Sequence, residues 1–308
     1  MLWQDKVLNT NLMKRLAIFA HFDKKNVIDD YVLFYVENLK KYCDKILFLS
    51  LSDLSQEEQS KLDNVILVKH NEYDFGSYKR GFNYALENNL LEDIDELLFV
   101  NDSVYCIDEL SKVFEKNYNS DFWGIVENKY GFKKYGKICV STLQPHLQSW
   151  FIAFRKNVFM SNDFIDFINS IKEEKTKNDI ILNYEIALTQ KLINSGFKYN
   201  SFITKYQNSF NPSIYYWREL LKDDCPFVKR SVLLGLNRDK TTIVNFEKEI
   251  KNKKVLQYIK NNTEEIKINT FTPILIKNFM FNILRNCPDM LRRIFTKILR
   301  TFFIFLFD

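Results

Sequence analysis

Glu96-Leu97-Leu98-Phe99-Val100-Asn101-Asp102-Ser103 is the stretch that decides the fold of this chain. Its four consecutive apolar residues predict a buried strand, which ends abruptly on a short polar turn that carries a carboxylate. In open α/β sheets, ligands bind outside the carboxyl ends of such strands. The stretch therefore predicts an α/β enzyme with its ligand at this turn.

Strand-like and helix-like segments alternate around this stretch. Short apolar runs predict further strands at 16–20, 45–51, 65–68, 121–126 and 149–154. Apolar residues at helical spacing predict helices at 27–41, 76–89, 109–116, 164–174 and 182–194. The alternation favours a mostly parallel central sheet with helices on both faces.

Composition supports a folded protein with a real core. The 308 residues are 46% hydrophobic and 27% charged, close to globular averages. This length fits one large α/β domain, or a domain of about 220 residues with an appended C-terminal region. We place the boundary of the second arrangement at residue 240, followed by a helical linker.

Charge and cysteine content indicate which kinds of partner and which cellular compartment to expect. The net charge is +5, and its basic residues are dispersed without any nucleic-acid-binding signature. The five cysteines are odd in number and form no C-x-x-C pair, which indicates a reducing cytoplasm. The apolar run at 16–20 is too short for a secretory signal. We expect a cytoplasmic protein that does not bind nucleic acid.

Polar residues that follow the predicted strands should meet at one edge of the sheet. These residues are Asp23, Asp74, Asn101, Asp102 and Ser103. Asp102 suits Mg²⁺ or Mn²⁺ held against a diphosphate, because these ions prefer hard oxygen ligands and take only one or two carboxylates beside phosphate. An ordinary turn is the alternative, because Asn, Asp and Ser are common turn residues.

The segment 73–81 upstream also looks suited to a ligand. Gly76 would let the backbone approach a ligand, Lys79 and Arg80 would meet phosphate, and Asp74 would accept a hydrogen bond from a base or ribose. The alternative is the solvated, capped start of a helix, with Gly76 merely at a turn.

Four segments together resemble the rhamnan synthesis protein F family, bacterial glycosyltransferases of cell-surface polysaccharide assembly with a GT-A-like pattern. The segments are Tyr73 to Gly81, Leu97 to Ser103, His146 to Phe154, and Tyr184-Glu185 with Leu188, Thr189 and Leu192. The resemblance covers roughly residues 14 to 235, and the order of the segments is more specific than any one of them.

The resemblance implies a GT-A-like domain at 1–240 that transfers a sugar from a nucleotide-sugar donor. Asn101-Asp102-Ser103 stands in place of the Asp-x-Asp motif with a single acid, so Asp102 would bind the metal while Asn101 and Ser103 make weaker contacts. A metal-independent transferase remains open. Ser77 falls within the donor-binding segment.

The resemblance also implies roles for residues elsewhere. Glu185 would be the general base that deprotonates the acceptor hydroxyl, where a glutamate of a helix first turn is the alternative. His146, Gln148 and Trp150 would form the acceptor or donor-sugar wall, although a buried histidine is an alternative for His146. His21 and Asp23 would lie where the nucleotide base docks, unless they form an ordinary loop.

The C-terminus is basic and amphipathic. Over 290–308 apolar residues recur at helical spacing while Arg292, Arg293, Lys297 and Arg300 occupy the other face. This pattern carries too many charges to span a bilayer but suits an anionic membrane surface. We expect residues 241–308 to form the linker and a region that associates with the inner face of the cell membrane; the alternative is a helix packed on the core.

Two classes of function follow. The first is an inverting glycosyltransferase that extends a lipid-linked glycan such as capsule or O-antigen. The second is a non-catalytic module that binds nucleotide-sugar or glycan within an assembly complex, which the single-acid motif permits.

Overall fold

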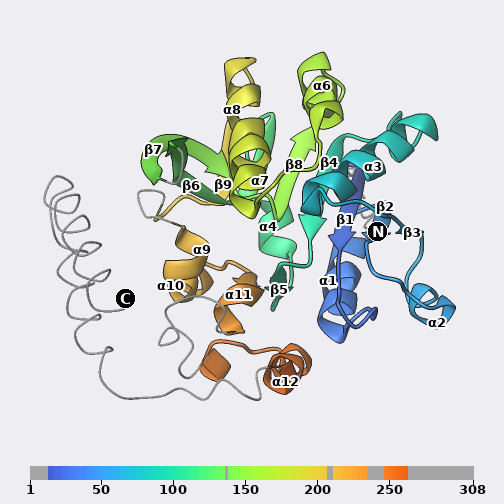
Figure 1. Cartoon of the computed structure of the whole chain (residues 1–308). Helices are drawn as coiled ribbons and strands as arrows, with labels where there is room; N and C mark the ends of the chain where they lie inside the picture. Colours follow the sequence, from blue (N-terminus) through green and yellow to red (C-terminus); the bar gives the residue numbers. More distant parts are fainter. Residues whose placement is uncertain (1–12, 136–137, 207–210, 235–245, 263–308) are drawn as a thin grey trace, which may run out of the picture.

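The computed structural model describes residues 13–135, 138–206, 211–234 and 246–262. Its main sheet has eight strands, and seven of them follow the order β3-β2-β1-β4-β8-β6-β7, with β9 also paired to β6. These strands are β1 (Arg15–His21), β2 (Lys45–Ser50), β3 (Val65–Leu67), β4 (Glu96–Asn101), β6 (Phe122–Tyr135), β7 (Ile138–Leu147), β8 (Phe151–Arg155) and β9 (Tyr199–Ile203). Figure 1 shows the sheet between its helices.

The sheet is mostly parallel, as predicted. β1 pairs in parallel with both β2 and β4, β2 with β3, and β6 with β9. β8 runs antiparallel between β4 and β6. β7 is the antiparallel partner of β6, and neither its strand nor the length of β6 beyond residue 126 follows from the apolar runs. The mixed sheet thus brings the start of β8 to the carboxyl end of β4.

Two hydrophobic clusters cover the two faces of the sheet. One contains the buried side chains of α1 (Asp30–Lys40), α4 (Ser111–Glu115), α10 (Trp217–Lys222), α11 (Arg230–Leu233) and α12 (Lys253–Asn262). The other contains those of α3 (Tyr73–Glu87), α5 (Lys156–Phe159), α6 (Asn162–Ser170), the π-helix η1 (Ile181–Ile186) and α8 (Ala187–Asn194). Helices therefore lie on both faces, and α12 joins the core of the first.

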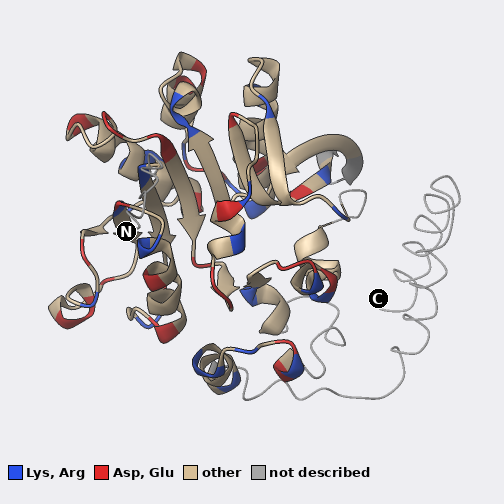
Figure 2. Ribbon diagram, turned by 180° about the vertical axis from the view of Figure 1, so that it is seen from behind, with Lys and Arg blue, Asp and Glu red and all other residues tan. Residues whose placement is uncertain are grey.

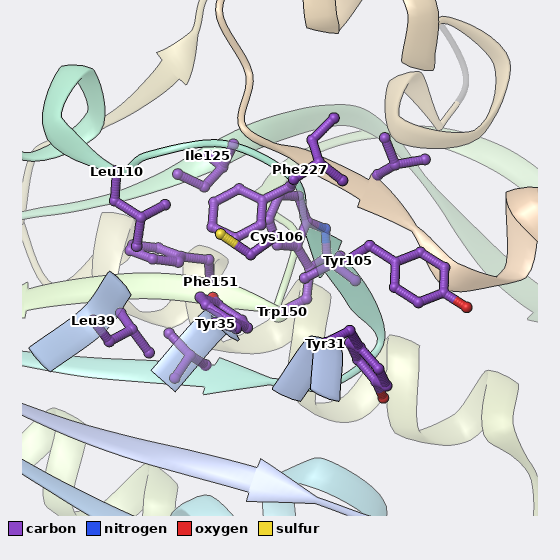
Figure 3. Close-up of a cluster of buried hydrophobic side chains, with 14 of the residues drawn as sticks. Tyr31, Tyr35, Leu39, Tyr105, Cys106, Leu110, Ile125, Trp150, Phe151 and Phe227 are labelled. Carbon is purple, nitrogen blue, oxygen red and sulfur yellow. The ribbon is translucent and has the colours of Figure 1, made fainter. Parts of the chain in front are cut away.

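Short elements complete the described chain. They are α2 (Gln56–Gln59), α7 (Lys177–Ile180), α9 (Pro212–Tyr215), the 3-10 helix η3 (Phe246–Lys248), and a second sheet in which β5 (Val104–Cys106) pairs antiparallel with β10 (Phe227–Lys229). Figure 3 shows that this small sheet is built into the first cluster, where Tyr105, Cys106 and Phe227 lie with Trp150 and Phe151.

Local sequence explains several of the helix ends. Ser161 and Thr176 accept hydrogen bonds from backbone N–H groups of α6 and α7 as N-caps. Gly196 has a φ of 90°, the left-handed conformation that favours glycine after a helix, and it ends the helix predicted at 182–194. That helix begins as the π-helix η1, which apolar spacing does not reveal.

Candidate functional site

The carboxyl ends of the central strands meet at one edge, as the parallel arrangement requires. β1 ends at His21, β2 at Ser50 and β4 at Asn101. The Asn101 N–H donates to the carbonyl of Trp150, 3.2 Å away, just before β8 begins. Residues at the start of β8 therefore join the edge predicted from the parallel strands alone.

The turn after β4 is both a local turn and a bridge to α3. Asn101 Oδ1 accepts hydrogen bonds from Ser103 N at 3.0 Å and from Ser103 Oγ at 2.6 Å, which is the behaviour of an Asx turn. Asn101 Nδ2 donates to Asp74 Oδ2 at 2.7 Å. This bond brings Asp74 to the turn, as the sequence predicted.

Asp102 is the buried acid of this turn, with 8% of its surface exposed. Its Oδ2 accepts a hydrogen bond from Phe22 N at 3.2 Å and lies 3.6 Å from Arg230 Nη1. Burial raises the Asp102 pKa to about 7, with Arg230 opposing the shift and Asp74 adding to it. Burial likewise raises the Asp74 pKa to about 6, against the pull of Lys229. Shifts of this kind in a carboxylate cluster are typical of functional sites.

Glu185 lies on η1, and π-helical turns occur frequently at functional sites. Its Oε2 accepts hydrogen bonds from Ser149 N at 3.0 Å and Ser149 Oγ at 2.5 Å. Its Oε1 lies 3.9 Å from Nε2 of His146. Because His146 Nδ1 is 2.7 Å from the carbonyl of Gln144, which can only accept, that nitrogen carries hydrogen. Ser149 thus fixes one oxygen of Glu185 and leaves the other facing His146.

Gln148 and Trp150 are held by other side chains of the protein. Gln148 Oε1 accepts from Trp150 Nε1 at 2.7 Å and from Ser213 Oγ at 2.5 Å, and Gln148 Nε2 donates to Asn211. Trp150 is 2% exposed and belongs to the core cluster of Figure 3. Hydrogen bonding and core packing are therefore enough to account for the positions of Gln148 and Trp150. Contact of either residue with a sugar stays a prediction.

His21 and Asp23 lie at the same edge but bond their neighbours. His21 Nδ1 is 2.9 Å from Ser50 Oγ, and burial lowers the His21 pKa to about 4. Asp23 Oδ1 accepts from Lys25 N at 2.6 Å in a local turn. His21 is therefore neutral at pH 7, and docking of a nucleotide base here stays a prediction.

The segment 73–81 lies inside α3, which begins three residues before the predicted helix. Lys79 Nζ donates to the carbonyls of Asn169 and Ile171, both at 2.8 Å. Arg80 bonds the carbonyl of Gly76 at 3.0 Å and Glu72 at 3.3 Å. Both cations are occupied within the protein, and none of their contacts with described residues reaches the acid turn, residues 101–103.

The rest of this segment packs against His70. Ser77 Oγ lies 3.0 Å from His70 Nε2, and a Cβ added at Gly76 would lie 2.4 Å from His70 Nδ1. The glycine therefore has a packing reason independent of any ligand. Of the segment's predicted donor contacts, only Asp74 reaches the carboxyl edge.

Two basic residues that the sequence did not single out lie near this turn: Lys229 ends β10 and Arg230 begins α11. β10 pairs with β5, which follows the acid turn, and Arg230 N donates to the carbonyl of Ser103 at 3.0 Å. This pairing sets Arg230 beside Asp102 and Lys229 opposite Val104. The only signal in the sequence is the pair of cations after the short apolar run Phe227-Val228, in a region without clear periodicity.

The turn offers few protein ligands to the predicted metal ion. Asn101 Oδ1 already accepts two hydrogen bonds, and the Asp102 carboxylate faces a guanidinium. Within the described residues, no three His, Cys, Asp or Glu side chains gather to hold an ion. One or two carboxylates beside phosphate oxygens are enough for Mg²⁺ or Mn²⁺, so metal binding by Asp102 stays a prediction.

Two surface hollows lie away from the carboxyl edge. One of about 260 Å³ is lined by Val36, Cys43, Lys45 and Asn64 near the starts of β2 and β3, and one of about 140 Å³ by residues that include Lys112, Leu221 and Glu249. Figure 2 shows Lys, Arg, Asp and Glu distributed along the ribbon. The acid turn is defined by its contacts, not by these hollows.

The predicted C-terminal membrane region, 290–308, lies outside the described residues, as does most of the proposed 241–308 unit. Among the helices that are described, none is long and apolar enough to cross a bilayer. The boundary at residue 240 stays a prediction.

Comparisons with known proteins agree with the resemblance. The family described as rhamnan synthesis protein F matches residues 46–281. Virulence protein VirA of Vibrio anguillarum is 25% identical over 263 residues, which cover 71% of this chain and 79% of that protein.

Two solved structures match this chain at lower sequence identity than VirA does. HddC from Yersinia pseudotuberculosis has 13% identity and a TM-score of 0.39, over 63% of this chain and 91% of HddC. The galactosyltransferase LgtC, solved with donor and acceptor sugar analogs, has 14% identity and a TM-score of 0.27, over 57% of this chain and 71% of LgtC. The sheet order and the helices on both faces confirm the predicted α/β fold class with a mostly parallel central sheet. This chain belongs to the rhamnan synthesis protein F family.

Proposed function

We propose that this chain is an inverting glycosyltransferase that moves a sugar from a nucleoside-diphosphate-sugar donor to a growing cell-surface polysaccharide. Family membership supports polysaccharide synthesis, because a rhamnan is itself a polysaccharide. The observation that carries the proposal is the pinned carboxylate of Glu185, which shares the carboxyl edge with Asp74 and Asp102.

Glu185 acts as the general base. Its Oε2 is held by two donors of Ser149, so Oε1 is left to accept the proton of the acceptor hydroxyl. The acceptor oxygen then bonds to the anomeric carbon as the bond from that carbon to the diphosphate oxygen breaks, and the electron pair leaves with the diphosphate. One direct displacement inverts the anomeric centre. His146 Nε2 lies 3.9 Å from Oε1, beyond hydrogen-bond distance, so Oε1 stays available to the acceptor.

Asp74 and Asn101 are positioned to bind hydroxyl groups of the donor. Their side chains are joined by a 2.7 Å hydrogen bond, which fixes both at the end of β4. The donor nucleotide, the sugar and the linkage follow from pocket shape, so the assay requires a panel of donors.

Replacing Glu185 with Gln tests the base. Gln keeps an oxygen for the two Ser149 donors but cannot take a proton, so turnover should fall roughly 10²–10⁴-fold while nucleoside diphosphate binding persists. The measurement is release of nucleoside diphosphate from a panel of nucleotide sugars with a glycan acceptor. Glu109→Gln is the control, because Glu109 forms a surface pair with Lys41.

Equal turnover of Glu185→Gln and the wild type would remove Glu185 from the mechanism. Binding of nucleotide sugars by the wild type without any turnover would instead favour the binding-module alternative.

Residues 290–308 supply a second part of the proposal, attachment to the inner face of the cell membrane beside a lipid-linked acceptor. The support is the basic amphipathic pattern of the sequence. Deletion of residues 273–308 should abolish flotation with vesicles that contain anionic lipid, whereas the full chain should float with them and not with neutral vesicles. Equal flotation of the two proteins would assign the segment to the protein's own core.

A further inference from the structure

Lys229 and Arg230 stand where the sequence predicted a metal ion. β10 pairs antiparallel with β5, with Lys229 opposite Val104, and Arg230 N donates to the carbonyl of Ser103 at 3.0 Å. The pairing fixes the backbone of both cations against the acid turn. Because this is strand pairing within a hydrophobic cluster, the cations are placed by the core and not by surface loops.

The side chain of Arg230 makes several contacts with the acid turn and with α1. Its Nη1 donates to the carbonyl of Asp102 at 3.2 Å, and its guanidinium carbon lies 4.9 Å from the ring centroid of Tyr31. The hydroxyl of Tyr31 donates to the same Asp102 carbonyl at 3.3 Å. Although its Nη1 is used, the Nε of Arg230 is buried and has no hydrogen-bond partner among the described residues. A buried donor without a partner is costly, and a ligand oxygen would satisfy it.

Lys229 reaches the other side of the same edge. Its ammonium lies 5.9 Å from the ring centroid of Trp150, and the residue before Trp150 is Ser149, which binds Glu185. The ammonium of Lys229 forms no ion pair or hydrogen bond within the described part of the chain. Burial lowers its pKa, while the nearby carboxylates of Glu185 and Asp74 raise it. Lys229 thus lies near both the proposed base and Asp74 as a partly buried cation.

We propose that Lys229 and Arg230 form the cationic site for the diphosphate of the donor, in place of a divalent ion; this rests on the function proposed above. The fork of a guanidinium binds phosphate oxygens in a directed way, and an ammonium adds a point charge. Together they neutralise the negative charge that develops on the diphosphate when its bond to the anomeric carbon breaks. The proton of the acceptor goes to Glu185, so the step needs no further reactant.

The test measures binding of inorganic pyrophosphate and of nucleoside diphosphates to the full chain by calorimetry in EDTA. Wild type should bind in EDTA with an affinity that added Mn²⁺ does not raise. Lys229→Gln and Arg230→Gln should each weaken binding at least tenfold, and Lys229→Arg should retain it. Lys112→Gln is the matched control, because Lys112 pairs with Asp224 on the surface, and it should bind as wild type does.

A purely structural role predicts a different result. Arg230 also holds the Asp102 carbonyl, so Arg230→Gln is accompanied by Arg230→Lys and by the melting temperature of each variant. If Lys229→Gln binds pyrophosphate as wild type does at an unchanged melting temperature, the site is wrong. Binding that vanishes in EDTA and returns with Mn²⁺ would also overturn it.

The same experiment separates this inference from the function on which it rests. Pyrophosphate binding in EDTA that depends on Lys229 and Arg230, without turnover of any nucleotide sugar, would keep the cationic site and remove the transferase. Turnover that requires Mn²⁺ and survives Lys229→Gln would keep the transferase and remove the cationic site. If neither pyrophosphate binding nor turnover is detected, both the cationic site and the transferase function are wrong.

Discussion

The acidic residues at the two ends of β4 differ in how fully their carboxylates are paired. At the amino end, Glu96 is fully buried and bonds Arg15 Nε at 2.7 Å, Arg155 Nη1 at 3.2 Å and Trp123 Nε1 at 2.8 Å. At the carboxyl end, Asp102 has one backbone donor at 3.2 Å and a guanidinium at 3.6 Å. Satisfied partners mark a structural acid, whereas a buried acid with few partners is available to a ligand.

The same change of acid to amide at the two ends should have opposite effects on stability. Glu96→Gln has the largest expected effect, because it leaves Arg15 and Arg155 buried without their carboxylate. Breaking a buried pair by removing one partner costs about 3–5 kcal/mol. Urea unfolding at pH 7.5 measures the loss. A change below about 1 kcal/mol would show that the network at the amino end is not structural.

Asp102→Asn should stabilise the protein at pH 8. The pKa of Asp102 is about 7 in the folded chain and 3.8 when unperturbed, so its contribution to stability is full below pH 3.8 and is lost as pH rises through 7. Asn has no such loss and still accepts from Phe22 N. The gain at pH 8 is at most about 4 kcal/mol, from roughly three pKa units at 1.36 kcal/mol each.

Melting temperatures of wild type and Asp102→Asn at pH 5 and pH 8 measure this effect. The difference between the two proteins should be larger at pH 8, and turnover should fall at both values. Greater destabilisation by Asp102→Asn at pH 8 than at pH 5 would mean that the Arg230 pair outweighs burial, and the contrast between the ends of β4 would fail.

Lys79→Met has the smallest expected effect. It tests whether Lys79 of α3 serves stability, as Glu96 does, or ligand binding, as proposed at the carboxyl end of β4. Lys79 donates to two backbone carbonyls at 2.8 Å, and losing such bonds costs on the order of 1 kcal/mol. Affinity for nucleoside diphosphate should not change, because the Lys79 side chain is bonded to carbonyls at the end of α6 instead of residues 101–103. A tenfold loss of affinity would restore the phosphate contact expected from the sequence. Lys69→Met, at a surface pair with Asp53, is the control for general charge.

The sequence determined those features that depend on short stretches of chain. Apolar runs predict β1 to β4, the start of β6 and β8, and the parallel rule then brings Asn101 and Asp102 to one edge, where Asn101 is hydrogen-bonded to Asp74. The motif order predicts the family, which the match over residues 46–281 confirms. Periodicity and strand order are local or topological properties, so they can be inferred without side-chain contacts.

Only the tertiary structure decided which charged residues share a site. Lys79 lies five residues from Asp74 in the chain, yet it is held by the carbonyls of Asn169, at the end of α6, and of Ile171, just after it. Arg230 lies 128 residues from Asp102, yet it donates to the Asp102 carbonyl. Pairing of β10 with β5 makes this contact, and it depends on burial of side chains from distant segments in a common core. Short-range spacing carries no information on such pairing, because the energy that fixes it comes from packing across the whole domain.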